Sequence, residues 1–143
     1  MQHDRFAARG ARPLLVTDTT ATERIAMSDI TEQVRTIALI GRKPGMSFEQ
    51  FDRYWRDEHA PLAAKVPGVV RYVQRHVVPQ DGAGEPDNGF GIDGLAVLDY
   101  ESAAAMDAGW ASEDGQRALA DTANFIGKHF VVVLDDHVIV GDS

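Results

Sequence analysis

Residues 47–62 read SFEQFDRYWRDEHAPL, and this stretch predicts an amphipathic helix. Ser47 is a favoured N-cap residue, and Gln50 three positions later completes a capping box. The apolar side chains then recur at spacings of three and four, which places them on one face of a helix. That face carries Phe48, Phe51, Trp55, His59 and Leu62, while Glu49, Arg53, Arg56 and Asp57 fall on the side facing solvent.

His59 is the one ionisable side chain on this apolar face. Pro61 has no N–H to donate to the carbonyl of Asp57, and it disfavours helical dihedrals at Ala60. We therefore expect the helix to kink or end at His59. An imidazole can take and give a proton near neutral pH, so His59 is a candidate acid–base group. The alternative is a core histidine that holds the helix end through a backbone carbonyl.

Length and composition restrict the class of protein. A chain of 143 residues suggests one domain with a sizeable core. The absence of cysteine excludes disulfides and thiolate catalysis, and it fits a cytoplasmic protein. The net charge of −8 disfavours nucleic acid as a partner. No apolar run approaches the roughly 20 residues of a transmembrane helix, so no membrane partner is expected.

The predicted elements follow the order β-α-β-β-α-β. Strands are expected at 36–41, 69–78, 95–100 and 130–140, and a second helical region runs from Ser102 to Ala123, with Trp110 just past the end of its first part. This is the split pattern of ferredoxin-like folds, an α+β class with an antiparallel sheet. The domain would span 35–143.

Residues 1–34 differ from the rest, because they have scattered arginines, a threonine-rich run and no periodicity. We interpret them as a flexible N-terminal arm, of which residues 1 to about 26 should be dispensable for folding. Two alternatives remain open. The physiological start is Met27, or Pro13 to Thr17 adds an edge strand to a neighbouring subunit.

The last predicted strand is apolar at consecutive positions, so both of its faces need cover. Helices would cover one face of the sheet, and a second copy of the same sheet is the simplest cover for the other. We therefore expect a homodimer that packs sheet against sheet.

A glycine-rich loop contains Gly89 to Gly94, which match the pattern G-x-G-x-x-G. A dinucleotide site needs this pattern to follow a strand and open a helix. Here a predicted strand follows instead, so we reject a nucleotide site.

Several motifs resemble the EthD family, which is named for ethyl tert-butyl ether degradation. They are RKPGMS before the helix, F-x-x-Y-W-x-x-E-H-A-P-L within it, PGVVRY after it and DDHVIV near the C-terminus. The resemblance covers roughly residues 34–140. It implies a dimeric α+β barrel and a role in small-molecule catabolism or secondary metabolism. Relatives include dehydratases of polyketide pathways and lactone isomerases, and similar barrels house cofactor-free monooxygenases and haem enzymes.

We expect a ligand cavity between the sheet and the two helical regions. The residues predicted to line it are His59, Trp55, Tyr72, Trp110 and Phe125, with Asn124 or His129 near its mouth. Core packing is the alternative for Trp55. No pair among the five histidines has metal-ligand spacing, so neither a metal nor a cofactor is expected.

Two classes of function remain open. The first is a cofactor-independent lyase, isomerase or oxygenase that acts on a small apolar carbonyl, lactone or phenolic compound, with His59 as the catalytic proton-transfer group. The second is a non-catalytic module that binds such a compound or assists a catabolic oxidase. Haem binding is a third, less favoured possibility.

Overall fold

The computed structural model describes residues 32–80, 85, 86 and 88–142. The predicted arm therefore lies outside the described residues except for 32–34, and Val34 already belongs to the first strand. The elements follow the predicted order. They are β1 (Val34–Arg42), α3 (Phe48–Tyr54), η2 (Trp55–His59), α4 (Ala60–Ala63), β2 (Val69–His76), β3 (Gly94–Tyr100), α5 (Ala103–Ala111), α6 (Glu113–Asp121), η3 (Thr122–Asn124) and β4 (Ile126–Leu134).

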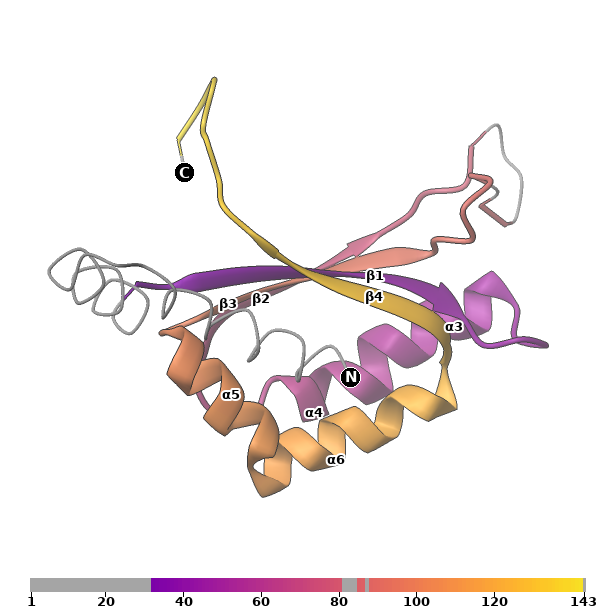
Figure 1. Ribbon diagram of the computed structural model, residues 1–143. Helices are drawn as coiled ribbons and strands as arrows, with labels where there is room; N and C mark the ends of the chain where they lie inside the picture. Colours follow the sequence, from indigo (N-terminus) through magenta and orange to yellow (C-terminus); the bar gives the residue numbers. More distant parts are fainter. Residues whose placement is uncertain (1–31, 81–84, 87, 143) are drawn as a thin grey trace, which may run out of the picture.

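The four strands form one antiparallel sheet in the order β2-β3-β1-β4. The helices lie together on one face of this sheet, below it in Figure 1. The predicted ferredoxin-like α+β fold is therefore confirmed. Among the described residues, no helix combines the length and the apolar character needed to cross a bilayer.

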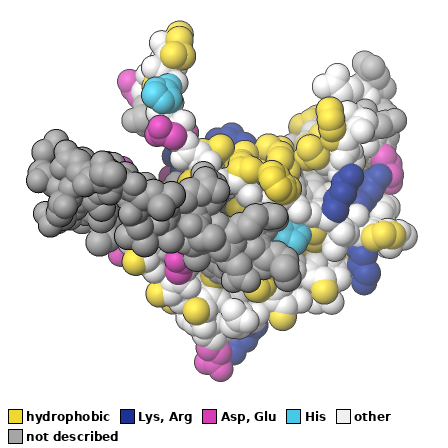
Figure 2. Space-filling model, viewed as in Figure 1, with side chains coloured by type: hydrophobic (Ala, Val, Ile, Leu, Met, Phe, Trp, Pro, Cys, Tyr) yellow, Lys and Arg dark blue, Asp and Glu magenta, His cyan; other side chains and the backbone are white. Residues whose placement is uncertain are grey.

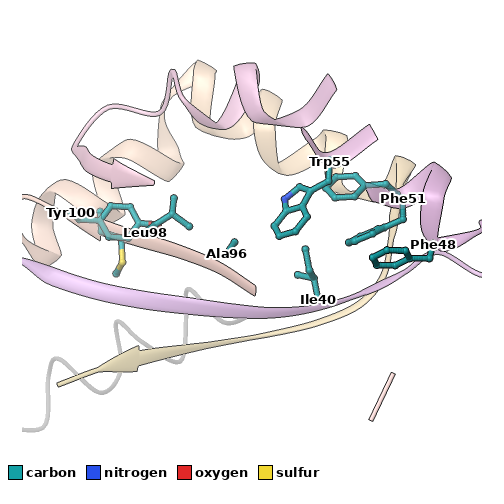
Figure 3. Close-up of a cluster of buried hydrophobic side chains, with 9 residues drawn as sticks. Ile40, Phe48, Phe51, Trp55, Ala96, Leu98 and Tyr100 are labelled. Carbon is teal, nitrogen blue, oxygen red and sulfur yellow. The ribbon is translucent and has the colours of Figure 1, made fainter. Parts of the chain in front are cut away.

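The core lies between the sheet and the first helical region, where Trp55 fills the centre (Figure 3). Its indole is 1% exposed and rests on the backbone of β3, because a Cβ added at Gly94 would lie 2.4 Å from the ring. Glycine at position 94 is thus what lets the ring approach the strand. The buried residues of this cluster are Ile40, Phe48, Phe51, Trp55, Ala96, Leu98, Tyr100, Met106 and Phe125.

The first helical region begins as the sequence predicts. The hydroxyl of Ser47 accepts from the backbone N–H of Gln50, and the Gln50 side chain accepts from the backbone N–H of Ser47, which completes the capping box. Of the predicted inward face, the side chains of Phe48, Phe51, Trp55 and His59 are buried and that of Leu62 is half-buried.

The predicted end or kink at His59 is replaced by a π-helical turn. The backbone N–H of Ala60 donates to the carbonyl of Trp55, five residues back. Pro61 then falls in the first turn of α4, where a helix needs no N–H donor. The helix therefore passes through the proline instead of stopping before it, and the wider turn shifts the side chains that follow.

Two other boundaries differ from the prediction. Trp110 lies inside α5, which runs on to Ala111, and it does not follow the helix end. Gly109 does not break the helix; it allows close contact, since a Cβ there would lie 2.1 Å from the carbonyl oxygen of Pro67. Ser112 then caps α6 by accepting from the N–H of Gly115.

The last strand ends earlier than predicted. Leu134 pairs with Arg35, and β1 begins at Val34, so the residues after 134 have no partner strand in the described sheet. Residues 135–142 instead leave the sheet on the side away from the helices (Figure 1). The loop that holds Gly89 and Gly91 leads into β3 and opens no helix, as predicted.

The sheet face opposite the helices is apolar, and no described helix covers it (Figures 1 and 2). Strand pairing places alternate residues on this face, because their neighbours Ile40, Ala96 and Leu98 point into the core. We call it the uncovered face. Its apolar residues are Ile37, Leu39, Val73, Leu95, Val97, Phe130, Val132 and Leu134.

Arg35 and Asp99 form an ion pair on the uncovered face. Nε of Arg35 donates to Oδ1 of Asp99 at 2.6 Å and Nη2 donates to Oδ2 at 2.9 Å, while Nη1 bonds Asp136. The hydrogen bonds from Arg35 lower the pKa of Asp99 against the opposing effect of burial, and the carboxylate in turn raises the pKa of Arg35.

We expect this ion pair to make stability depend on pH. A lowered folded-state pKa contributes stability above the unfolded value of about 3.9, and that contribution is lost as the pH falls through the folded-state pKa. The Asp99→Asn variant should be about 1 kcal/mol less stable than wild type at pH 7, discounted because Arg35 is partly exposed. Urea unfolding of wild type and of Asp99→Asn at pH 7 and at pH 3 measures the stability difference between them. If that difference is the same at the two pH values, the lowered pKa of Asp99 is contradicted.

Candidate functional site

A buried carboxylate at the C-terminus of α6 connects three side chains. Oδ1 of Asp121 accepts from the hydroxyl of Tyr54 at 2.6 Å and from Nδ2 of Asn124 at 2.9 Å. Oδ2 lies 2.9 Å from Nδ1 of His59. The side chains of His59 and Asp121 are only 9% and 11% exposed. We call these four residues the Asp121 cluster.

The Asp121 carboxylate is ionised in this cluster. Burial alone raises its pKa, but the hydrogen bonds from Tyr54, Asn124 and His59 outweigh burial, and the net effect lowers the pKa. An ionised carboxylate can only accept hydrogen bonds, so Nδ1 of His59 must carry the proton. In the neutral ring, the lone pair is therefore on Nε2.

Nε2 is the ring nitrogen of His59 that remains available for chemistry. No hydrogen bond joins it to another described residue, and it is not one of the buried side-chain atoms that lack a partner. It therefore lies at the part of the ring that is still accessible. The ring of Phe125 lies against the imidazole, with centroids 4.8 Å apart, and provides an apolar wall.

A surface pocket of about 500 Å³ adjoins the Asp121 cluster. Tyr54 and Asn124 line it and so link it to Asp121. The hydrogen bond to Asp121, reinforced by burial, raises the pKa of Tyr54, which keeps the phenol protonated. The other lining residues are Lys43, Pro44, Gly45, Met46, Gln50, Arg53, Asp57 and Glu58.

Sequence reasoning missed Asp121 and Tyr54. His59 is five positions after Tyr54, and in an α-helix that spacing points two side chains in directions about 140° apart. The π-turn between them lets both side chains reach the same carboxylate. Asp121 is 62 positions from His59, so helical periodicity could not identify it.

A second polar cluster joins β2 to the first helical region, α3 and η2. Nε2 of Gln74 donates to the carbonyl of Trp55 and to the hydroxyl of Tyr72, both at 2.9 Å. His76 bonds Oε1 of Gln74 through Nε2 and Asp52 through Nδ1. Tyr72 is thus directed at the helix and paired there, and burial raises the pKa of its phenol.

Of the other predicted site residues, Trp55 and Phe125 are 1% and 0% exposed and pack in the core rather than around an open cavity. The ring of Phe125 also contacts His59, whereas Trp55, Tyr72, Trp110 and His129 have no hydrogen bond or ring contact with the Asp121 cluster. Trp110 donates from Nε1 to the hydroxyl of Tyr100 at 2.8 Å. His129 is exposed on β4. The structure therefore brings together His59, Phe125 and Asn124 of the predicted set, and a ligand role for these residues stays a prediction.

A second pocket, of about 560 Å³, lies on the other side of the turn after β1. Arg42 and Lys128 line it, and Arg42 bonds Glu85 at 2.8 Å. Nη1 of Arg42 is buried and has no hydrogen-bond partner among the described residues. Among the described residues, no three His, Asp or Glu side chains lie close enough together to hold a metal ion.

Comparison with known proteins places this chain in a family. The EthD domain matches residues 43–129, which is more than half of the chain. The chain belongs to the EthD family. The match contains the whole Asp121 cluster. An uncharacterized 11.0 kDa protein of Rhodococcus erythropolis, from the thcB-thcC intergenic region, is 32% identical over 90 residues, which are 63% of this chain and 82% of that protein.

Solved structures show the same fold as this EthD-family protein. An EthD family protein of Bacillus halodurans is 21% identical with a TM-score of 0.59, over 74% of this chain and 100% of that one. A protein of Thermobifida fusca, described as dimeric, ferredoxin-like and of unknown function, is 20% identical with a TM-score of 0.53, over 71% of this chain and 89% of that one. At these identities the likeness shows the fold alone.

Proposed function

We propose that this EthD-family protein catalyses cofactor-independent acid–base chemistry on a small, mostly apolar carbonyl, lactone or phenolic compound, as a lyase, isomerase or oxygenase. The observation that carries the proposal is the buried His59–Asp121 pair with Nε2 left available. Membership of the EthD family supports a role in small-molecule catabolism, and the His59–Asp121 pair supports acid–base chemistry. His59 is the proton-transfer group.

Each member of the Asp121 cluster has a defined role in this proposal. Nε2 of His59 takes a proton from the substrate, and the ionised Asp121 stabilises the imidazolium that forms. Tyr54 and Asn124 hold Asp121 in place through Oδ1 and expose polar groups to the neighbouring pocket. The apolar ring of Phe125 supports the imidazole from one side.

The His59→Gln variant tests the proposal. Glutamine keeps a hydrogen-bond donor for Asp121 but cannot transfer a proton, so turnover should fall by roughly 100-fold or more while the fold persists. Purified protein is incubated with a panel of small lactones, cyclic ketones and phenols, and conversion is followed by NMR. The matched control is His137→Gln, an exposed histidine outside the cluster, which should keep full activity. Unchanged turnover in a folded His59→Gln variant would show that the ring is structural.

The tautomer of His59 gives a readout that needs no substrate. The nitrogen chemical shifts of the neutral ring should report a proton on Nδ1 and a lone pair on Nε2. The Asp121→Asn variant should change the ratio of the two neutral tautomers of His59. The asparagine amide can donate a hydrogen bond to Nδ1 as well as accept one from it, whereas the carboxylate can only accept. A proton on Nε2 in the neutral wild-type ring would remove the base from the accessible edge and contradict the mechanism.

A non-catalytic role is the second candidate, and one observation favours it. His59 lines neither of the two pockets, whereas the pocket beside Tyr54 is large enough for a small ligand. A binding module that assists a catabolic oxidase would use that pocket alone. This role would be favoured by a panel compound that changes the NMR chemical shifts of the Tyr54 and Asn124 backbone amides but is never converted.

We also infer that the protein forms a homodimer through the uncovered face. No described helix covers the eight apolar side chains of this face, and two of them, Phe130 and Leu134, are 50% and 37% exposed. Exposed apolar side chains gathered on one face are typical of an interaction surface. The description of the Thermobifida fusca protein as dimeric supports a dimer. A second copy would bury each face against its equivalent across a two-fold axis.

A further inference from the structure

We propose that Gln74 is a positioning residue for His59, because it bonds the carbonyl of Trp55 and so holds the π-helical turn that brings the imidazole to Asp121. The inference rests on the proposed function for its catalytic consequence. Gln74 is half-buried on β2 and pairs in register with Ala96, whose side chain lies in the core. Its side chain therefore points to the face of the sheet that carries the helices (Figure 1).

The carbonyl of Trp55 is the group at which the π-turn differs from an α-helical turn. It accepts from the backbone N–H of Ala60, five residues further on. In an α-helix it would accept from the N–H of His59, four residues further on. The same carbonyl also accepts from Nε2 of Gln74 at 2.9 Å. A side chain that enters the hydrogen-bond ladder of a helix is one of the known causes of a distorted turn.

The width of this turn decides which way His59 points. Residues four apart on an α-helix share a face, so an α-helical turn would direct His59 to the same side as Trp55, over the core. The π-turn instead directs the ring to the carboxylate that also bonds Tyr54, where Nδ1 lies 2.9 Å from Oδ2 of Asp121. Gln74 therefore acts on His59 through the backbone of the turn and not by contact with a substrate.

The neighbours of Gln74 fix its amide in the orientation that donates to the helix. Oε1 lies 2.9 Å from Nε2 of His76, while Nε2 faces the carbonyl of Trp55. The opposite orientation would place Oε1 against that carbonyl oxygen, and two acceptors cannot bond each other. His76 also bonds Asp52 of α3 through Nδ1. Strand β2 therefore holds the helix at Asp52 and at Trp55, on either side of Tyr54.

NMR of the full-length Gln74→Glu variant at about pH 8, where glutamate is ionised, tests the inference. A carboxylate has the shape of the amide and keeps an acceptor for His76, but it cannot donate to the carbonyl of Trp55. The ratio of the Nδ1–H to the Nε2–H tautomer of the neutral His59 ring should fall about tenfold or more, because the ring loses its hydrogen bond to a charged acceptor. The amide hydrogen of Ala60 should exchange with solvent about tenfold faster or more, since the turn that it closes is loosened.

Gln116→Glu is the matched control. Nε2 of Gln116 donates to the carbonyl of Trp110 at 2.7 Å, so the same substitution removes the same kind of bond away from the π-turn. Both readouts should stay within about twofold of wild type, because the two sites share no partner. Gln74→Met is a second variant, which removes the donor without adding a charge and should shift both readouts in the same direction as Gln74→Glu. Circular dichroism confirms that each variant folds, and unchanged readouts in both folded variants of Gln74 would overturn the inference.

Turnover of a converted panel compound separates this inference from the proposed function. Gln74→Glu should lower kcat about tenfold with little change in KM, because Gln74 places the proton-transfer group without binding the substrate. A shifted tautomer ratio in Gln74→Glu together with full turnover in His59→Gln would support the positioning of the ring and overturn its role in proton transfer. Lost turnover in His59→Gln together with an unchanged His59 ring in both variants of Gln74 would overturn the positioning role alone.

Discussion

Replacing Trp55 by alanine is expected to lower the free energy of unfolding by about 3–5 kcal/mol. The indole is 1% exposed and fills the centre of the core between η2 and β3. Its ring lies 5.6 Å from that of Phe51 and 4.5 Å from that of His76, measured between centroids. The packed backbone of β3 cannot collapse into the space left behind, so the variant would keep a cavity.

Urea unfolding followed by circular dichroism measures the loss. Phe90→Ala is the control, because Phe90 is an exposed aromatic residue and its removal should change stability by no more than about 0.5 kcal/mol. A loss below about 1 kcal/mol for Trp55→Ala would mean that the sheet and helix close over the gap. The core would then not depend on this ring.

The Asp121→Ala variant is expected to lose about 2–4 kcal/mol at pH 7. Alanine removes the acceptor shared by Tyr54, Asn124 and His59. His59 is buried and Tyr54 is half-buried, and a buried donor left unpaired costs about 1–3 kcal/mol, whereas the exposed Asn124 can bond water instead. Asp114→Ala is the matched control on the same helix. Asp114 forms an exposed ion pair with Arg117, and such pairs contribute about 0–1 kcal/mol.

The loss at Asp121 should depend on pH in a defined direction. The hydrogen bonds that outweigh burial lower the folded-state pKa of Asp121, so its contribution is complete above the unfolded value of about 3.9. It is lost as the pH falls through the lowered folded-state pKa. The difference between wild type and Asp121→Ala should therefore shrink in acid. A difference that stays constant down to pH 2 would contradict the assignment of Asp121 as ionised.

The order of the elements and the buried side of the first helix could be predicted from local patterns. The capping box at Ser47 and Gln50 marks the helix start, and the three-and-four spacing of apolar residues marks its inward face. Such patterns depend on neighbours within one or two turns, so the sequence contains all of the information they need. The same holds for the apolar last strand, which indicated that one sheet face lacks a cover.

The candidate site depends on contacts that no local pattern contains. Asp121 meets His59 across 62 positions, and Tyr54 joins them only because a π-turn carries the helix past Pro61. The end of β4 at Leu134 is set by where β1 begins, not by the valines that continue to Val140. The sequence by itself thus determined the elements, their order and their apolar faces. Only the tertiary structure decided which carboxylate holds His59 and where the last strand stops, because both depend on partners brought together by folding.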